Sequence, residues 1–215
     1  MNWVIGDIHG MNQQLNAVLK EIKRQDKDPQ FWFVGDYCDR GPDSFGVVET
    51  ILGLGDKAHP IRGNHDDIMD CICRRGPTPH SDAQHSDAHI ESMTWFLKFG
   101  MVETLNSYGV TIDEIREATR SQQGFTTLLD KIPQTHRDFY ENLPLYREAD
   151  DFFICHAYCP KDSEGGPAEI IDYAQWRRAM MWDRFDIDQI NNHKDWRKTG
   201  YFGHTPTVNY GLESG

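Results

Sequence analysis

Side chains that can bind metal ions are concentrated in three short glycine-bearing segments and at two later histidines. The segments are Gly6-Asp7-Ile8-His9-Gly10, Gly35-Asp36-Tyr37-Cys38-Asp39-Arg40-Gly41 and Arg62-Gly63-Asn64-His65-Asp66, and the histidines are His156 and His204. Carboxylate, imidazole and amide ligands suit hard or borderline divalent ions such as Mn, Fe or Zn. One ion needs fewer ligands than this set offers, so the sequence predicts a two-metal hydrolytic centre.

The residue types suggest how such a centre would be divided. Asp7 and His9 are two residues apart, so one short turn can aim both at a first ion. Asp36 is the candidate for a carboxylate that bridges two ions. Three residues would complete the shell of the second ion: Asn64, His156 and His204. A solvent molecule shared by two cations loses a proton near neutral pH and becomes the nucleophile.

Other side chains in these segments suit proton transfer and phosphate binding. His65 follows the ligand candidate Asn64 and could protonate a leaving group, with Asp39 orienting its ring. Arg40 and Arg62 could each clamp phosphate oxygens, because a planar guanidinium matches that geometry. These residue types together predict hydrolysis of a phosphate ester.

Apolar runs precede the three segments and alternate with helical patterns. The predicted strands are residues 2–6, 31–35 and 58–62. A βαβαβ run implies parallel strands joined by right-handed crossovers, and ligands collect at the carboxyl ends of such strands. Two further strands are expected at residues 152–155 and 201–203, and they end at His156 and His204. The candidate ligands should therefore meet at one sheet edge.

Helical spacing predicts the connecting elements. One helix is expected over residues 11–24 and a second from Asp43 onward, each with an apolar inner face. The inner faces would consist of Leu15, Val18, Leu19 and Ile22, and of Phe45, Val48, Ile51 and Leu52. Residues 76–89 are rich in turn formers and predict a loop, whereas residues 90–143 predict several helices. These helices should share one apolar stripe: Trp95, Phe96, Phe99, Val102 and Leu105.

Each motif also has a purely structural interpretation. Asp and Gly are common in turns and histidine is often structural, so a single Gly-Asp-x-His-Gly segment indicates little. Three such segments at successive strand ends are hard to explain by coincidence. For the remaining candidates we prefer the structural interpretation. They are solvated loop histidines and buried cysteines: His80, His85, His89, Cys71, Cys73, Cys155 and Cys159.

Length and charge set further bounds. A chain of 215 residues is long enough for one well-packed domain over 1–215, and a monomer is expected. The formal charge of -12 argues against a protein that holds nucleic acid by its phosphates. No apolar run approaches membrane-spanning length, and the first residues lack the pattern of a signal peptide. The 5 cysteines fit free thiols, so we expect a cytoplasmic protein with no membrane partner.

In this order, Gly-Asp-x-His-Gly, Gly-Asp-x-x-Asp-Arg-Gly, Gly-Asn-His-Asp and Gly-His-Thr-Pro resemble the phosphoprotein phosphatase branch of the calcineurin-like metallophosphoesterases. The sequence from Asp39 to Ser44 is similar to that of the bacterial and bacteriophage-lambda type serine/threonine phosphatases. The resemblance implies an α/β (α+β) fold with a central β-sandwich flanked by helices, in which residues 76–143 form a loop and helical insertion. It implies two divalent ions, with Mn expected, held by the ligands above. It also adds Arg184 as a third phosphate-binding arginine, with Arg177 and Arg178 as neighbouring alternatives.

The function implied by the resemblance is a metal-dependent phosphomonoesterase. The expected enzyme is a serine/threonine, or dual-specificity, protein phosphatase that acts on phosphorylated proteins or peptides by direct attack of a metal-bridging hydroxide. One alternative is a hydrolase of dinucleoside tetraphosphates or other nucleotides, a group that shares the ligands but often varies at the position of Asp39. The other alternative is an inactive metal-binding interaction protein, against which His65 and the arginines argue.

Overall fold

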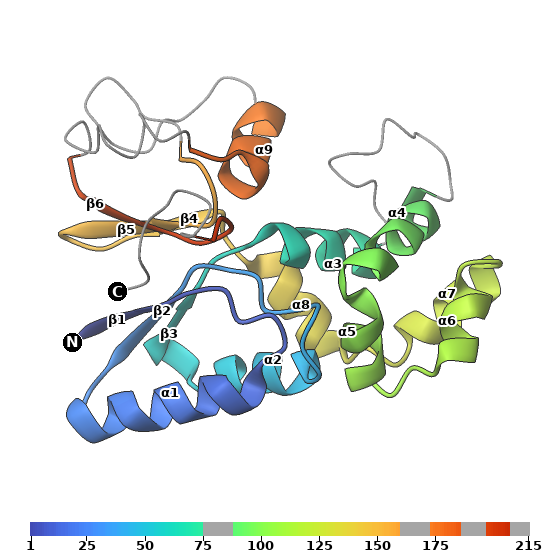
Figure 1. The fold of residues 1–215 in the computed structure, drawn as a ribbon, viewed down its shortest axis with the longest axis horizontal. Coiled ribbons are helices and arrows are strands. Elements are labelled where there is room, and N and C mark those ends of the chain that lie inside the picture. The colour runs from blue at the N-terminus through green and yellow to red at the C-terminus, as the bar shows by residue number, and fades with distance from the viewer. Residues whose placement is uncertain (75–87, 160–172, 186–196, 207–215) are drawn as a thin grey trace.

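A computed structural model describes residues 1–74, 88–159, 173–185 and 197–206, and it contains two three-stranded sheets (Figure 1). The first sheet consists of β1 (Asn2–Ile5), β2 (Gln30–Phe33) and β3 (Ala58–Pro60), which are all parallel. The second consists of β4 (Tyr146–Glu148), β5 (Phe152–Cys155) and β6 (Thr199–Phe202). In it, β4 runs antiparallel to β5 and β6 runs parallel to it.

The two sheets pack face to face. Side chains alternate along a strand, so one set from each central strand can face the other sheet. From β2, Trp32 packs against Phe152 of β5 with ring centroids 4.8 Å apart, and Ile154 belongs to the same buried cluster. The other set on β2 includes Phe31 and enters the main core. This interface confirms the β-sandwich, whereas the parallel sheet expected from the strand pattern is only one of its two layers.

Two crossover helices cover the outer face of the first sheet (Figure 1). These are α1 (Asn12–Gln25) and α2 (Ser44–Leu52), near their predicted positions. Their inner faces differ from the prediction at Val18 and Leu52, which are 47% and 42% exposed. Each lies about 60–100° around the helix from the centre of the buried stripe, because successive residues are rotated by about 100°. A flat sheet covers only the central stripe.

The predicted helices between the two sheets are confirmed. Those of the predicted range 90–143 are α4 (Ala88–Phe96), α5 (Met101–Ser107), α6 (Ile112–Ala118), α7 (Gln122–Leu129) and α8 (Gln134–Asn142), with the short 3₁₀ turn η2 (Leu97–Phe99). Two further elements were not predicted: α3 (Asn64–Arg74), which follows β3, and the 3₁₀ turn η1 (Gly55–Lys57), which precedes β3. The single apolar stripe is wrong, since Trp95 and Phe99 are 49% and 43% exposed. Gly100, with φ of 101°, ends η2 and starts α5, so it interrupts the helix. The residues before and after Gly100 therefore do not lie on one helix face.

Some expectations are not decided by the fold. Residues 76–87 of the predicted loop lie outside the described residues, as do His80 and His85, whereas its last two residues, Ala88 and His89, belong to α4. A single domain with an insertion over residues 76–143 stays a prediction. All 5 cysteines are buried free thiols. Among the described residues, no helix is long and apolar enough to cross a membrane.

Candidate metal centre

The loops after the strands carry unusual backbone conformations. In the described part of the chain, five residues other than glycine have a positive φ: His9, Asp36, Asp39, Arg40 and His204. All five are predicted site residues. Such conformations are costly for residues with a Cβ, and they persist where the surrounding structure enforces them, often at functional sites. The loops are also tightly packed, because a Cβ on Gly63 would overlap the Asp36 carboxylate.

The Asp36 carboxylate lies between two imidazoles. One oxygen, Oδ2, is 3.4 Å from Nε2 of His9, and the other, Oδ1, is 3.4 Å from Nε2 of His156. The side chain is buried, and Asp36 lies three residues after the end of β2. A carboxylate with a separate imidazole at each oxygen has the arrangement required to bridge two ions.

The first half of the centre contains His9 and Asp7. Nδ1 of His9 lies 2.9 Å from the carbonyl oxygen of Cys38 and donates to it, so the lone pair of Nε2 is directed toward Asp36. Burial lowers the pKa of His9, which keeps the ring neutral. Asp7 accepts the backbone N–H of His204 at 3.0 Å, so this half is linked directly to the β6 end.

The second half contains Asn64, His156 and His204. The Asn64 side-chain oxygen lies 2.9 Å from Nε2 of His156 and 3.1 Å from Nδ1 of His204. Nδ1 of His156 donates to the carbonyl oxygen of Val34 at 2.8 Å. Nε2 of His156 therefore faces oxygen atoms of Asn64 and Asp36. Burial, with the nearby His156, lowers the pKa of His204 to about 4, so this ring is also neutral.

These donor groups fit divalent ions. Burial raises the pKa of Asp7, and burial together with the charge of Asp36 raises the pKa of Asp66 to about 7. Asp36 and Asp66 are buried, whereas the Asp7 side chain is 25% exposed. Buried charges of one sign need compensating positive charge, and metal ligands must be neutral imidazoles or ionised carboxylates. Atoms that could bind a metal in the predicted ligands His9 and Asp36 and in the predicted acid His65 also lie within 4.8 Å of one another. The predicted ligand residues are therefore brought together with suitable chemistry.

His65 and Asp39 form a buried pair beside this cluster. Nδ1 of His65 donates to Oδ2 of Asp39 at 2.7 Å. Burial opposes a charged imidazole, but the hydrogen bond to Asp39 and the charge of Asp36 outweigh it and raise the pKa of His65. On the other side of the ring, Nη2 of Arg40 lies 3.2 Å from Nε2. A histidine oriented in this way can deliver a proton from Nε2 once Arg40 has moved from that nitrogen and the ring is protonated.

Arg62 is arranged differently from Arg40. All its N–H groups are directed at protein acceptors: the Asp67 and Asp70 carboxylates and the carbonyl oxygens of Tyr140, Glu141 and Leu143. No N–H remains for a phosphate without breaking this network. The phosphate-binding role of Arg62 stays a prediction, and this arrangement counts against it. The sequence pattern missed Asp67 and Asp70 as partners, although their spacing of three residues places both on one face of α3.

The three arginines near α9 (Tyr173–Trp182) also differ. Arg177 forms an ion pair with Asp67, which joins α9 to α3. Arg178 and Arg184 are exposed. Only for Arg184 does the structure give a link to the centre, because its positive charge contributes to the lowered pKa of His204. The phosphate-binding role of Arg184 stays a prediction.

Asp66 has a role that the sequence did not reveal. Its carboxylate accepts three backbone N–H groups, from Asp36 at 2.7 Å and from Tyr37 and Gly63 at 2.9 Å. It thereby joins the loop after β2 to the loop after β3. The Gly-Asn-His-Asp motif contained this residue, but nothing in its spacing separates a loop anchor from a ligand.

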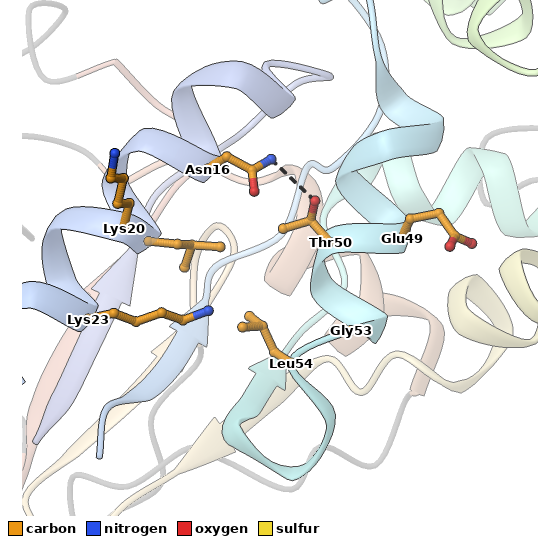
Figure 2. Close-up of a pocket in the computed structure, with 8 residues that line it drawn as sticks. Asn16, Lys20, Lys23, Glu49, Thr50, Gly53 and Leu54 are labelled. Atoms are coloured by element: carbon orange, nitrogen blue, oxygen red, sulfur yellow. Dashed lines mark hydrogen bonds between the residues drawn. The ribbon is translucent and has the colours of Figure 1, made fainter. Parts of the chain in front are cut away.

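A separate groove lies on the far side of the first sheet, between α1 and α2 (Figure 2). Its volume is about 420 Å³, and its lining includes Lys20, Lys23 and Glu49. Asn16 donates to Thr50 across it at 3.4 Å. None of the predicted site residues lines this groove, so we do not assign the chemistry to it.

Comparison with known proteins places these features among phosphoesterases. The calcineurin-like phosphoesterase family matches residues 3–206. A symmetrical bis(5'-nucleosyl)-tetraphosphatase of Nitrosococcus oceani is 41% identical over 64 residues, which are 30% of this chain and 23% of that protein. The one from Salmonella arizonae is 27% identical over 136 residues, or 60% of this chain and 44% of that protein.

Solved structures support the same fold. The crystal structure of a putative diadenosine tetraphosphatase has a TM-score of 0.51 and 19% identity, and the match covers 94% of this chain and 74% of that one. At this identity the likeness concerns the fold alone. The matches to the two curated relatives span less than half of the length of either relative.

Proposed function

The chain belongs to the calcineurin-like phosphoesterase family, and on that premise we propose that it is a metal-dependent hydrolase of nucleoside polyphosphates such as dinucleoside tetraphosphates. The observation that carries hydrolysis is the Asp36 carboxylate, with His9 at one oxygen and His156 at the other. An inactive metal-binding protein would not need a His65–Asp39 pair beside this carboxylate.

The proposed ligand sets follow the two halves of the centre. Asp7 and His9 would hold one ion and Asn64, His156 and His204 the other, with Asp36 shared. Bound divalent ions, of which Mn is the expected one, supply an activated water near neutral pH and neutralise phosphate charge. Asp66, the other buried carboxylate near the centre, joins the loops after β2 and β3 and is not a proposed metal ligand.

The protein's own side chains provide the remaining steps. His65 gives the proton on Nε2 to the leaving oxygen as the P–O bond breaks. Asp39 stabilises the charged form of the ring and fixes its orientation through Nδ1. Arg40 binds non-bridging phosphate oxygens, since its guanidinium lies beside the nitrogen that delivers the proton. Arg184 is proposed as a second phosphate contact.

Apolar surface beside the centre supports a nucleotide substrate. A groove of about 330 Å³ is lined by Asp7 together with Ile8, Met11 and Val18. Elsewhere, the ring centroids of Phe96 and His65 lie 6.1 Å apart, and the exposed rings of Trp95 and Phe99 pack against Phe96. Aromatic and apolar surfaces of this kind can accept nucleobases, in line with the activity named for the curated relatives.

A serine/threonine protein phosphatase is the second candidate. The observation that favours it is the intact Asp39, whose carboxylate lies 2.7 Å from His65, because the motif resemblance implies that this position is retained in the phosphatases and often varies in the tetraphosphatases. Phosphorylated proteins or peptides would then be the substrates. Both candidates use the same metal centre and the same general acid, so only the substrate separates them.

A substrate panel tests the proposal. The metal-reconstituted protein is assayed with diadenosine tetraphosphate, a phosphoserine peptide and p-nitrophenyl phosphate. We expect kcat/KM for the dinucleotide to exceed that for the peptide by at least about tenfold, or ~1.4 kcal/mol of transition-state binding. The reverse order would favour the phosphatase. Inactivity toward all three would refute both, and Asp36→Asn provides the matched inactive control.

A further inference from the structure

The loop that carries Asp39 and Arg40 needs support from outside itself. Both residues are left-handed, with φ of 70° and 69°, and two consecutive residues of this kind are costly. The support comes from a distant part of the chain, the segment formed by η2 and α5. Gly100, between these two elements, accepts the backbone N–H of Arg40 at 3.0 Å.

Thr104 of α5 contacts Asp39 twice. Its hydroxyl oxygen accepts the backbone N–H of Asp39 at 2.7 Å and donates to Oδ1 of the Asp39 side chain at 2.8 Å. The Ser44 hydroxyl lies 3.0 Å away on the same oxygen. A hydroxyl has a single hydrogen, so with that hydrogen on Oδ1, Thr104 accepts from Ser44. Thr104, Ser44 and Asp39 have no exposed surface.

These contacts fix both oxygens of the Asp39 carboxylate. Oδ1 is held by Thr104, and Oδ2 receives Nδ1–H of His65 at 2.7 Å. Without the Thr104 hydroxyl, Oδ1 would be buried without this donor, and the carboxylate could rotate about its χ2 angle. The His65 ring would then lose its fixed direction, because Oδ2 is its partner at Nδ1.

We propose that Thr104 is a positioning residue for the general acid of this enzyme, acting on His65 through Asp39. The inference rests on the proposed function only as far as phosphoester hydrolysis, whichever substrate is cleaved. Thr104 exchanges no proton: the His65 Nε2–H bond breaks, an O–H bond forms on the leaving group, and the P–O bond electrons remain with that oxygen.

Thr104→Val tests this because valine has nearly the same shape and lacks the hydroxyl. For phenyl phosphate, a poor leaving group, we expect kcat to fall about 10- to 100-fold, which is part of the roughly 10²–10⁴-fold that general acid assistance supplies. For p-nitrophenyl phosphate the fall should be less than about threefold, since its leaving group needs little protonation. KM and Mn binding, measured by calorimetry, should not change, and Thr104→Ser should restore the wild-type ratio.

Ser44→Ala is the matched control, because it removes a buried hydroxyl from the same cluster without touching Asp39. It should leave the ratio of the two activities unchanged. Equal losses for both esters in Thr104→Val, or a failure of Thr104→Ser to restore the ratio, would overturn the inference. If Thr104→Val does not fold, Thr104→Ala removes the same hydroxyl with less steric strain and is read in the same way.

A second measurement separates this inference from the proposed function. The ring N–H of His65, hydrogen-bonded to Asp39, gives a proton NMR signal in labelled protein. Its loss in Thr104→Val and its return in Thr104→Ser would support the positioning role even if the wild type cleaved neither ester. Retention of the signal in Thr104→Val would contradict it. Inactivity of the wild type toward both esters would count against the proposed function alone.

Discussion

Nε2 of His65 lies 3.2 Å from Nη2 of Arg40, on the opposite side of the ring from the Asp39 carboxylate. Since Nδ1–H donates to Asp39, Nε2 accepts from Arg40, and the ring is in its neutral form. The positive charge of Arg40 also opposes protonation of His65. A phosphate that binds Arg40 would draw the guanidinium away from Nε2 and release this nitrogen to take up a proton.

Removing this guanidinium should therefore affect binding as well as chemistry. We expect Arg40→Ala to raise KM and lower kcat, with kcat/KM falling about 10- to 100-fold, as for loss of a charge-assisted hydrogen bond to phosphate. Steady-state kinetics with p-nitrophenyl phosphate measure this. Arg24→Ala, which removes an exposed arginine paired with Glu21, serves as control. An unchanged KM in Arg40→Ala would remove Arg40 from the phosphate site.

Arg62 should behave as a stabilising residue. Its removal leaves the buried Asp67 and Asp70 carboxylates with only Arg177 and Arg74 as ionic partners, and breaking a buried ion pair costs up to about 3–5 kcal/mol. Arg62→Ala should thus lower the free energy of unfolding in urea by that amount, whereas Arg40→Ala should change it little. If Arg62→Ala keeps its stability and loses only phosphate affinity, the original prediction for Arg62 is correct.

The sign of the pH dependence follows from the raised pKa of His65. The acid must be protonated, so activity is present below this pKa and is lost as pH rises through it. With phenyl phosphate, we expect kcat to decline on the alkaline side with an apparent pKa above the ordinary histidine value of about 6.5. Asp39→Asn replaces the carboxylate that supports the charged ring with a neutral amide, so the decline should move to lower pH. A profile that is identical in Asp39→Asn would show that another group titrates.

The location of the site was predictable because the ends of the strands can be recognised in the sequence. Asp7, Asp36 and Asn64 each follow an apolar run, and parallel strands bring such positions to one edge. The second sheet was not predictable from periodicity. Phe152 and Ile154 face the first sheet while Phe153 faces another cluster, so β5 is apolar on both faces and shows no alternation.

The contacts that support the site were harder to predict. Arg62 and Arg40 are alike in sequence context, but only the folded chain shows that helix α8 supplies carbonyl oxygens to Arg62. Thr104 is one threonine among several in a helical region, 65 residues from its partner Asp39. Its role depends on where α5 packs, and no local pattern determines that.

The two buried carboxylates Asp36 and Asp66 should respond in opposite ways to the same isosteric change. Asp66 accepts three backbone N–H groups, and an amide nitrogen in place of one oxygen would face at least one of them. We expect Asp66→Asn to lower the free energy of unfolding by about 2 kcal/mol or more.

Asp36→Asn should instead remove metal binding and activity while the protein remains folded. Asp36 is a buried charge between His9 and His156, and metal ions would compensate it in the active protein. The metal-free variant should be at least as stable as metal-free wild type in urea. Wild type should gain stability on addition of Mn, by RT ln(1 + [Mn]/Kd), and the variant should gain little. Equal stabilisation of the two proteins by Mn would contradict a bridging role for Asp36, even if the variant were inactive.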